Sequence, residues 1–202
     1  MANLERFTVD AKASRFSVKA VASGMTAGLG HNPTIAIRDF EGEAEFDRDA
    51  LDSAALTMRI KAASLSVDED MNMEDRRTLE RIMHQEVLST SRYPEVLYTT
   101  RSAKVTKLAE GSYRIDLTGN LTLRGVTRIQ MVSGQVTIGP YSLRATGNFE
   151  VRQSNFDIPV PNVAGGLMKI RDDLKFAFYI VARQSDGSEM SRNQHIGSNA
   201  RY

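Results

Sequence analysis

Apolar and polar residues alternate along most of the chain, a pattern typical of β-strands with one buried face. The clearest alternation extends over residues 115–123, and similar runs cover residues 16–22, 56–60, 143–151 and 174–180. Glycine and proline residues separate several of these runs, which predicts tight reversals of the chain. The pattern therefore predicts many long strands and few other elements.

Two of the predicted strands change phase partway along their length. Apolar residues occupy odd positions at Ile35 and Ile37 but even positions from Phe40 onward, and the same change follows Met131. Because a slip of one residue would turn the apolar face outward, we expect one β-bulge near residues 38–39 and another near residues 132–133. Bulges also curl a sheet, so the strands are expected to form a closed barrel or a sandwich.

One segment, residues 72–88, has the periodicity of a helix. Asn72 is a suitable N-cap, and acidic residues follow it in the first turn. We expect His84 to lie on the solvated surface of this helix. The apolar residues form one stripe that should cover an opening or a flank of the sheet, and they are Leu79, Ile82, Met83 and Val87.

The composition is that of an ordinary globular protein, with 202 residues, 41% of them hydrophobic and 25% charged. A net charge of +1 predicts no nucleic-acid partner. The absence of cysteine excludes disulfides, thiolate metal ligands and a cysteine nucleophile. The chain lacks a signal peptide and a long apolar run, so we expect a cytoplasmic protein without stable membrane insertion. One domain over residues 1–183 and a polar, disordered tail over residues 184–202 are predicted.

The sequence holds few residues suited to catalysis or metal binding. His31 stands out among the three histidines because it lies in a glycine-containing loop, where functional residues are common. No second histidine or pair of carboxylates accompanies it at the spacing of metal ligands, and no nucleotide-binding or nucleophile motif is present. We therefore expect no catalytic site, no metal and no cofactor.

The run from Gly119 to Arg128 resembles the Gly-x-Leu-Thr-x-(His or Arg)-Gly-Val-Thr signature of the YceI-like domain family. Residues 7–19, 40–46, 86–98 and 147–158 resemble other parts of that family in the same order, so the resemblance covers about residues 5–183. Three positions depart from the usual pattern, Gln153, Asn155 and Asp157, and Arg124 stands where histidine is often found.

This resemblance implies a mainly β fold, a single antiparallel lipocalin-like β-barrel of about eight strands with one α-helix in a long connection. It also implies non-catalytic binding of a polyisoprenoid, quinone-like or fatty-acyl lipid in an apolar pore, for carriage, storage or sequestration. We expect Tyr98 or His31 to meet a polar head group at the rim. Strand alternation predicts the residues that line the pore: Phe16, Val18, Ile35, Ile37, Leu56, Met58, Ile60, Val96, Tyr98, Leu121, Leu123, Ile129, Met131, Phe149, Phe176 and Phe178.

Two other functions are compatible with the sequence. The first is a small hydrolase or isomerase that uses His31 with a carboxylate such as Asp39 or Asp157. The second is a barrel filled by its own side chains that acts as a protein-interaction module, with a homodimer as one form. A filled core needs no ligand, and eight-stranded barrels are of the size at which both arrangements occur.

Overall fold

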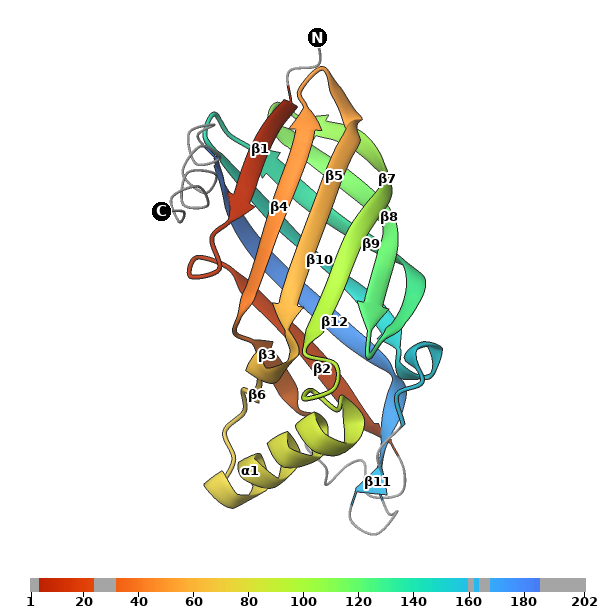
Figure 1. Cartoon of the computed structure of the whole chain (residues 1–202). Helices are drawn as coiled ribbons and strands as arrows, with labels where there is room; N and C mark the ends of the chain where they lie inside the picture. Colours follow the sequence, from red (N-terminus) through yellow and green to blue (C-terminus); the bar gives the residue numbers. More distant parts are fainter. Residues whose placement is uncertain (1–3, 24–31, 160–161, 164–167, 186–202) are drawn as a thin grey trace, which may run out of the picture.

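The computed structural model describes residues 4–23, 32–159, 162–163 and 168–185, and Figure 1 shows a tilted antiparallel barrel with a helix at one end. Two short 3₁₀ segments, η1 (Ala62–Ser64) and η3 (Gln153–Phe156), connect strands. The helical connection consists of α1 (Met73–Arg81) and η2 (Ile82–Val87). The strands are β1 (Leu4–Val9), β2 (Arg15–Ser23), β3 (Thr34–Ile37), β4 (Phe40–Asp47), β5 (Ala50–Lys61), β6 (Leu65–Val67), β7 (Glu95–Ala109), β8 (Ser112–Leu123), β9 (Val126–Ile138), β10 (Ser142–Arg152), β11 (Asn162–Val163) and β12 (Met168–Gln184).

Eight strands close the barrel, in the order β1-β4-β5-β7-β8-β9-β10-β12, because β12 also pairs with β1. Farther along, β12 pairs with β2, which continues through β3 to β6. The pairings between these strands are antiparallel, and short turns join the consecutive pairs β4–β5, β7–β8, β8–β9 and β9–β10. The prediction of a mainly β, closed antiparallel barrel with one helix between strands is therefore confirmed.

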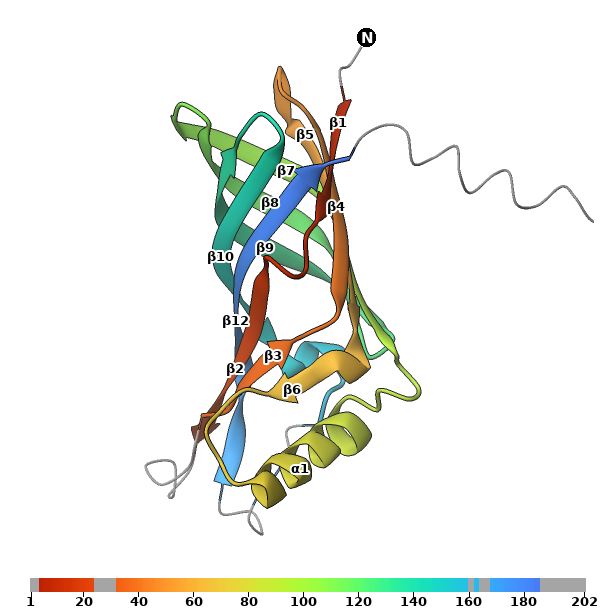
Figure 2. The same ribbon diagram turned by 90° about the vertical axis from the view of Figure 1, so that its left-hand side faces the viewer.

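The helix begins where the sequence predicts. The Asn72 side chain accepts a hydrogen bond from the Asp75 backbone N–H at 2.9 Å, which caps the first turn. After Arg81 the helix widens into the π-helical turn η2, which ends at Val87. Figure 2 shows α1 crossing the end of the barrel near β3 and β6. The predicted apolar stripe thus lies over one opening of the barrel.

The first predicted bulge is instead a corner between two strands. β3 ends at Ile37 and β4 begins at Phe40, and the intervening Asp39 N–H donates to the Ser64 hydroxyl at 3.0 Å. Ile37 and Phe40 are both buried although one is odd and the other even. The predicted change of phase is therefore present, but it comes from a break between β3 and β4 and not from a bulge.

The second predicted bulge is wrong. β9 pairs with β8 in one unbroken register through residues 132–133, so its even-numbered residues face inward throughout. Ile129 and Met131 consequently lie on the outer face, where they are 55% and 60% exposed. The alternation misled because these two outward residues are apolar, whereas the inward residue between them, Gln130, is polar.

Candidate ligand-binding cavity

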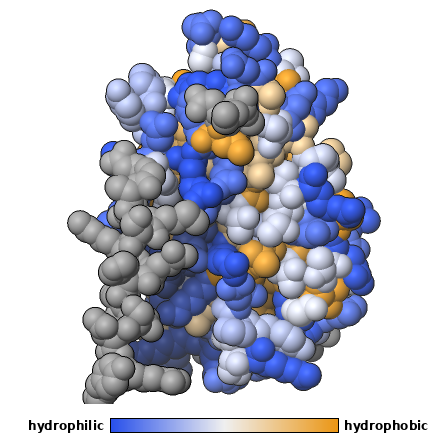
Figure 3. Space-filling model, turned by 45° about the horizontal axis from the view of Figure 1, so that its top comes forward, coloured by the Kyte–Doolittle hydropathy of each residue, from blue (hydrophilic) through white to orange (hydrophobic). Residues whose placement is uncertain are grey.

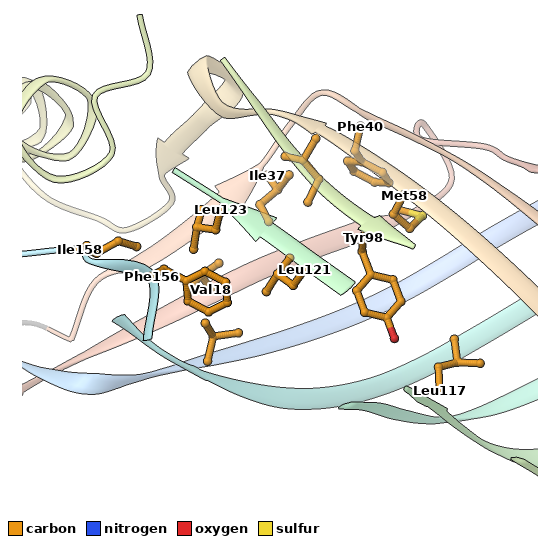
Figure 4. Packing of buried hydrophobic residues seen from close by; sticks show 12 residues of the cluster. Val18, Ile37, Phe40, Met58, Tyr98, Leu117, Leu121, Leu123, Phe156 and Ile158 are labelled. Atoms are coloured by element: carbon orange, nitrogen blue, oxygen red, sulfur yellow. The ribbon is translucent and has the colours of Figure 1, made fainter. Parts of the chain in front are cut away.

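The barrel encloses a cavity of about 320 Å³, which is within the range of roughly 300–1,000 Å³ that is typical of small-molecule sites. Its walls come from the barrel strands, from β2 and β3, and from the helical connection. Figure 4 shows Met58, Tyr98, Leu117 and Leu121 directed into this interior. The lining is almost wholly apolar, so the cavity is suited to hydrocarbon.

Phenylalanines from three strands form a belt around one part of the cavity. Phe149 and Phe176 stack with ring centroids 4.8 Å apart, and the Phe16 centroid lies 6.1 Å from that of Phe176 and 6.4 Å from that of Phe178. We call Phe16, Phe149, Phe176 and Phe178 the aromatic belt. All four line the cavity and remain partly exposed, although they point into the barrel. Residual exposure of inward-facing rings means that neighbouring side chains do not fill the space beside them.

Glycines on the neighbouring strands explain why these large rings leave the cavity open. A Cβ at Gly147 would lie 2.5 Å from the Phe178 ring, and one at Gly134 would lie 3.2 Å from it. A Cβ at Gly119 would likewise lie 2.5 Å from the Tyr98 ring. The Phe178 and Tyr98 rings therefore lie flat along the wall, in the space that side chains at these glycine positions would otherwise fill.

The helical connection forms one end of the cavity. Leu79, Ile82, Met83 and Val87 all line it, as the stripe in the sequence indicated. The Glu80 carboxylate accepts from the Val67 N–H at 2.9 Å, which ties α1 to β6. His84, which we expected on the solvated surface, is instead partly buried, and its Nε2 lies 3.0 Å from the Leu65 carbonyl. These contacts hold the helix against the strands beneath it.

Few polar side chains reach the cavity. The Tyr98 hydroxyl donates to the Gln130 carbonyl at 3.4 Å, and burial raises the pKa of Tyr98 to about 12, so this phenol stays neutral at physiological pH. Gln153 is buried and donates to the Arg171 carbonyl at 2.9 Å. Each of these groups already has a partner in the protein.

Arg124 differs from these groups. It lies in the turn between β8 and β9, lines the cavity, and donates from Nη1 to the Asp157 carbonyl. Its Nε is buried and has no hydrogen-bond partner among the residues that the structure describes. A desolvated donor without an acceptor is costly for a protein, and such groups call for an explanation.

The structure places most of the predicted pore residues in the lining. The prediction that Ile129 and Met131 line the pore is wrong, because the register of β9 turns both side chains outward. Tyr98 is buried within the barrel and does not lie at the rim. His31 lies outside the described residues. The predicted residues that do line the cavity are Phe16, Val18, Ile35, Ile37, Leu56, Met58, Ile60, Val96, Tyr98, Leu121, Leu123, Phe149, Phe176 and Phe178.

Sequence reasoning missed the one arginine and the two glutamines that line the cavity in the described part of the chain: Arg124, Gln130 and Gln153. An unbroken even phase along residues 126–138 would have placed Gln130 inside, but the apolar residues at 129 and 131 favoured the opposite assignment. Arg124 is not among the residues that strand alternation predicts for the pore lining. Nothing in the local pattern indicates that this turn points its side chain at the cavity.

The charged residues that the structure describes do not form a metal site. Within these parts of the chain, no three histidine, aspartate or glutamate side chains are grouped closely enough to bind a metal ion. The described part of the chain also has no helix that is both long and apolar enough to cross a bilayer.

Comparisons with known proteins agree with this architecture. The sequence model of the YceI-like domain family matches residues 7–182. BcnA of Burkholderia cenocepacia has a similar structure, with a TM-score of 0.65 at 17% identity over 86% of this chain and 98% of BcnA. No curated protein matches the chain.

Two further solved structures share the fold. A polyisoprenoid-binding domain from Saccharophagus degradans, implicated in plant cell wall breakdown, has a TM-score of 0.64 at 13% identity over 92% of this chain and all (100%) of that domain. The YceI protein of Campylobacter jejuni has a TM-score of 0.58 at 18% identity over 75% of this chain and 85% of its own. At these identities the likeness concerns the fold alone.

Proposed function

The chain belongs to the YceI-like domain family, and from this premise we propose that it binds the hydrocarbon chain of a lipid inside its barrel without catalysing a reaction. The ligand would be a polyisoprenoid, a quinone-like or a fatty-acyl lipid, held for carriage, storage or sequestration. One observation carries the proposal: the four rings of the aromatic belt face the cavity and yet stay partly exposed.

Burial of hydrocarbon supplies the driving force. Each methylene moved from water into the cavity contributes about 0.8 kcal/mol, so one five-carbon isoprene unit contributes about 4 kcal/mol before ordering costs. Two or three buried units could therefore give micromolar or tighter binding. The similarity of fold to the Saccharophagus domain, which is described as polyisoprenoid-binding, supports the same class of ligand.

Neither alternative function gains support from the described residues. Asp157 is exposed, and its carbonyl accepts the hydrogen bond from Arg124. Asp39 is also exposed and lies 3.6 Å from the Lys61 ammonium. A filled barrel would bury its inward side chains fully, and those of the aromatic belt are not fully buried.

The first experiment asks whether the protein carries a ligand. We would compare native and denaturing mass spectra of the purified protein and then titrate delipidated protein with geranylgeraniol. An extra mass that is lost on denaturation and extracts as a long-chain lipid, or saturable binding of geranylgeraniol, supports the proposal. Absence of both overturns it.

Adjacent residues of β9 provide a matched pair of variants. Val132 lines the cavity, whereas the neighbouring Met131 lies on the outer surface. Val132→Trp places an indole in the cavity and should weaken geranylgeraniol binding by at least about tenfold, because it occupies the space of a few methylenes. Met131→Trp adds the same group outside and should bind like the wild type.

Tryptophan fluorescence also shows whether the two variants fold. The chain contains no tryptophan, so each introduced indole is the sole one present and its emission shows whether it is buried. If Val132→Trp fails to fold, Leu174→Trp, at another lining position, replaces it. Equal binding by a folded cavity variant and by Met131→Trp would contradict a ligand site inside the barrel.

A further inference from the structure

Arg124 is the one charged side chain that lines the cavity in the described part of the chain. The other lining residues are apolar apart from a few tyrosine and glutamine side chains, and no carboxylate is among them. Within the same residues Arg124 makes no ion pair. A cation in apolar surroundings is unfavourable without a counter-charge, so this position lacks an anion.

The hydrogen bonds of the guanidinium leave one edge available. Nη1 donates to the Asp157 carbonyl, while Nε is buried without an acceptor and no described residue accepts from Nη2. Nε and Nη2 together form the edge with which arginine binds two oxygens of a carboxylate or phosphate. The protein thus orients the guanidinium through one nitrogen and leaves the two nitrogens of this edge for another acceptor.

The backbone at Arg124 gives an independent indication. Arg124 and Gly125 both have positive φ, 52° and 76°, as the central residues of a tight type I′ reversal do. Asparagine and glycine are favoured at the first of these positions, because a longer side chain is strained in the left-handed region. Asp157, whose carbonyl receives the bond from Nη1, also has a positive φ of 53°. Strain retained at two residues joined by one hydrogen bond is typical of a functional site.

From these observations we infer that Arg124 binds the anionic head group of the lipid, a phosphate or a carboxylate, at the end of the cavity formed by the helical connection. The inference rests on the proposed function. The hydrocarbon chain then extends from Arg124 along the aromatic belt toward the opposite end, where Phe46 and Leu143 lie. Arg124 therefore determines both the orientation of the ligand and its charge preference.

The test compares charged and uncharged lipids with the same chain. Wild-type protein should bind geranylgeranyl phosphate about 10- to 100-fold more tightly than geranylgeraniol, and palmitate more tightly than hexadecanol, as expected for a charge-assisted hydrogen-bonded pair. A preference in only one of the two pairs identifies the head group as phosphate or as carboxylate. Equal affinity within both pairs overturns the inference while leaving the proposed function intact.

The variant Arg124→Asn separates the head-group role from a structural one. Asparagine suits the left-handed turn, so the fold should be kept, and the preference for the charged lipids should disappear while affinity for the alcohols stays within about twofold. Arg144→Gln removes one positive charge from an exposed site on β10 and should keep the preference. If Arg124→Asn keeps the preference, or if Arg144→Gln abolishes it, Arg124 does not bind the head group. If the wild-type protein binds none of the four lipids, the proposed function itself is rejected.

Discussion

Phenylalanine occupies two different environments inside this barrel. Phe7 and Phe46, near the end opposite the helix, are 0% and 3% exposed, and their stacked ring centroids lie 5.3 Å apart. Phe149 and Phe176 of the aromatic belt stack even more closely, at 4.8 Å, yet both remain partly exposed. Residue type and ring stacking are therefore alike in the two regions. The difference lies in whether neighbouring side chains fill the space around the rings.

The packed region is completed by contacts across the barrel. Phe7 and Phe46 form a buried cluster with Val136, Leu143 and Ala182, which come from three other strands. In the hollow region the corresponding wall carries Gly134 and Gly147 beneath the Phe178 ring. Phe46, Val136, Leu143 and Ala182 also border the cavity, so the packed cluster closes this end of it. The region of the aromatic belt leaves the space that a ligand would fill.

Outside the barrel, apolar residues also remain exposed at the packed end. Leu4, Leu108 and Tyr141, all close to strand ends there, are exposed. Figure 3, which brings this end forward, shows scattered apolar surface between polar residues. Isolated exposed apolar residues are common in soluble proteins. The contrast between the two regions therefore concerns the interior.

The largest expected effect is the loss of stability when the packed cluster around Phe7 is disrupted. Phe7→Ala should lower the free energy of unfolding by about 3–5 kcal/mol, because it removes a fully buried ring and leaves a cavity. Phe176→Ala is the matched change in the belt and should cost less, about 1.5–3 kcal/mol, since that ring is already partly exposed. Urea denaturation measures both. A larger loss for Phe176→Ala would contradict the distinction between the regions.

A smaller effect is expected from a substitution in the cavity wall that pushes the Phe178 ring into the cavity. Gly147→Ala places a Cβ 2.5 Å from the Phe178 ring and 2.4 Å from the Ser133 carbonyl, so the ring must move toward the cavity. Such overpacking typically costs about 1–3 kcal/mol. Geranylgeraniol affinity should fall together with stability in the titration. Unchanged affinity would show that the Phe178 ring does not limit the space.

The helical connection borders the region of the aromatic belt and not the packed cluster around Phe7. A variant of its N-cap, Asn72, tests this difference. Asn72→Ala removes the acceptor for the Asp75 N–H and should cost about 1 kcal/mol. Because α1 and η2 close one end of the cavity, hydrogen exchange in residues 73–87 and the rate of ligand release should both increase. Exchange at β1 and β4, beside Phe7 and Phe46, should stay the same. A uniform increase over the whole chain would count against this assignment.

The smallest effect is expected outside both regions. Ile129→Ser changes an outer-surface residue that is 55% exposed, so stability should change by no more than about 0.5 kcal/mol and lipid affinity should stay the same. Thermal unfolding and the geranylgeraniol titration check both quantities. A marked loss of affinity would restore the original prediction that Ile129 lines the cavity.

Much of the fold could be predicted from local pattern. Strict alternation over residues 115–123 marks β8, and the apolar stripe of residues 79–87 marks the helical segment that reaches the cavity. Asn72 could be identified as the cap because capping depends only on residues three positions apart. These signals are local, so tertiary contacts were not needed to read them.

The facing of β9 could not be predicted in this way. Ile129 and Met131 are apolar but exposed, and only the unbroken pairing with β8 shows that Gln130 faces inward. Hydrophobicity indicates burial only on average, since folded proteins expose many apolar residues. Register, which is a property of two strands together, decided the question.

The sequence by itself determined the mainly β class, the helix and part of the cavity wall, because alternation and capping depend on neighbours in the chain. Only the tertiary structure decided that the barrel is hollow beside the aromatic belt and packed around Phe7, and that Arg124 reaches the cavity from its turn. The physical reason is that empty space and unpaired donors depend on atoms brought together from distant strands. A pattern along one strand cannot show which side chains from the other strands fill the space opposite it.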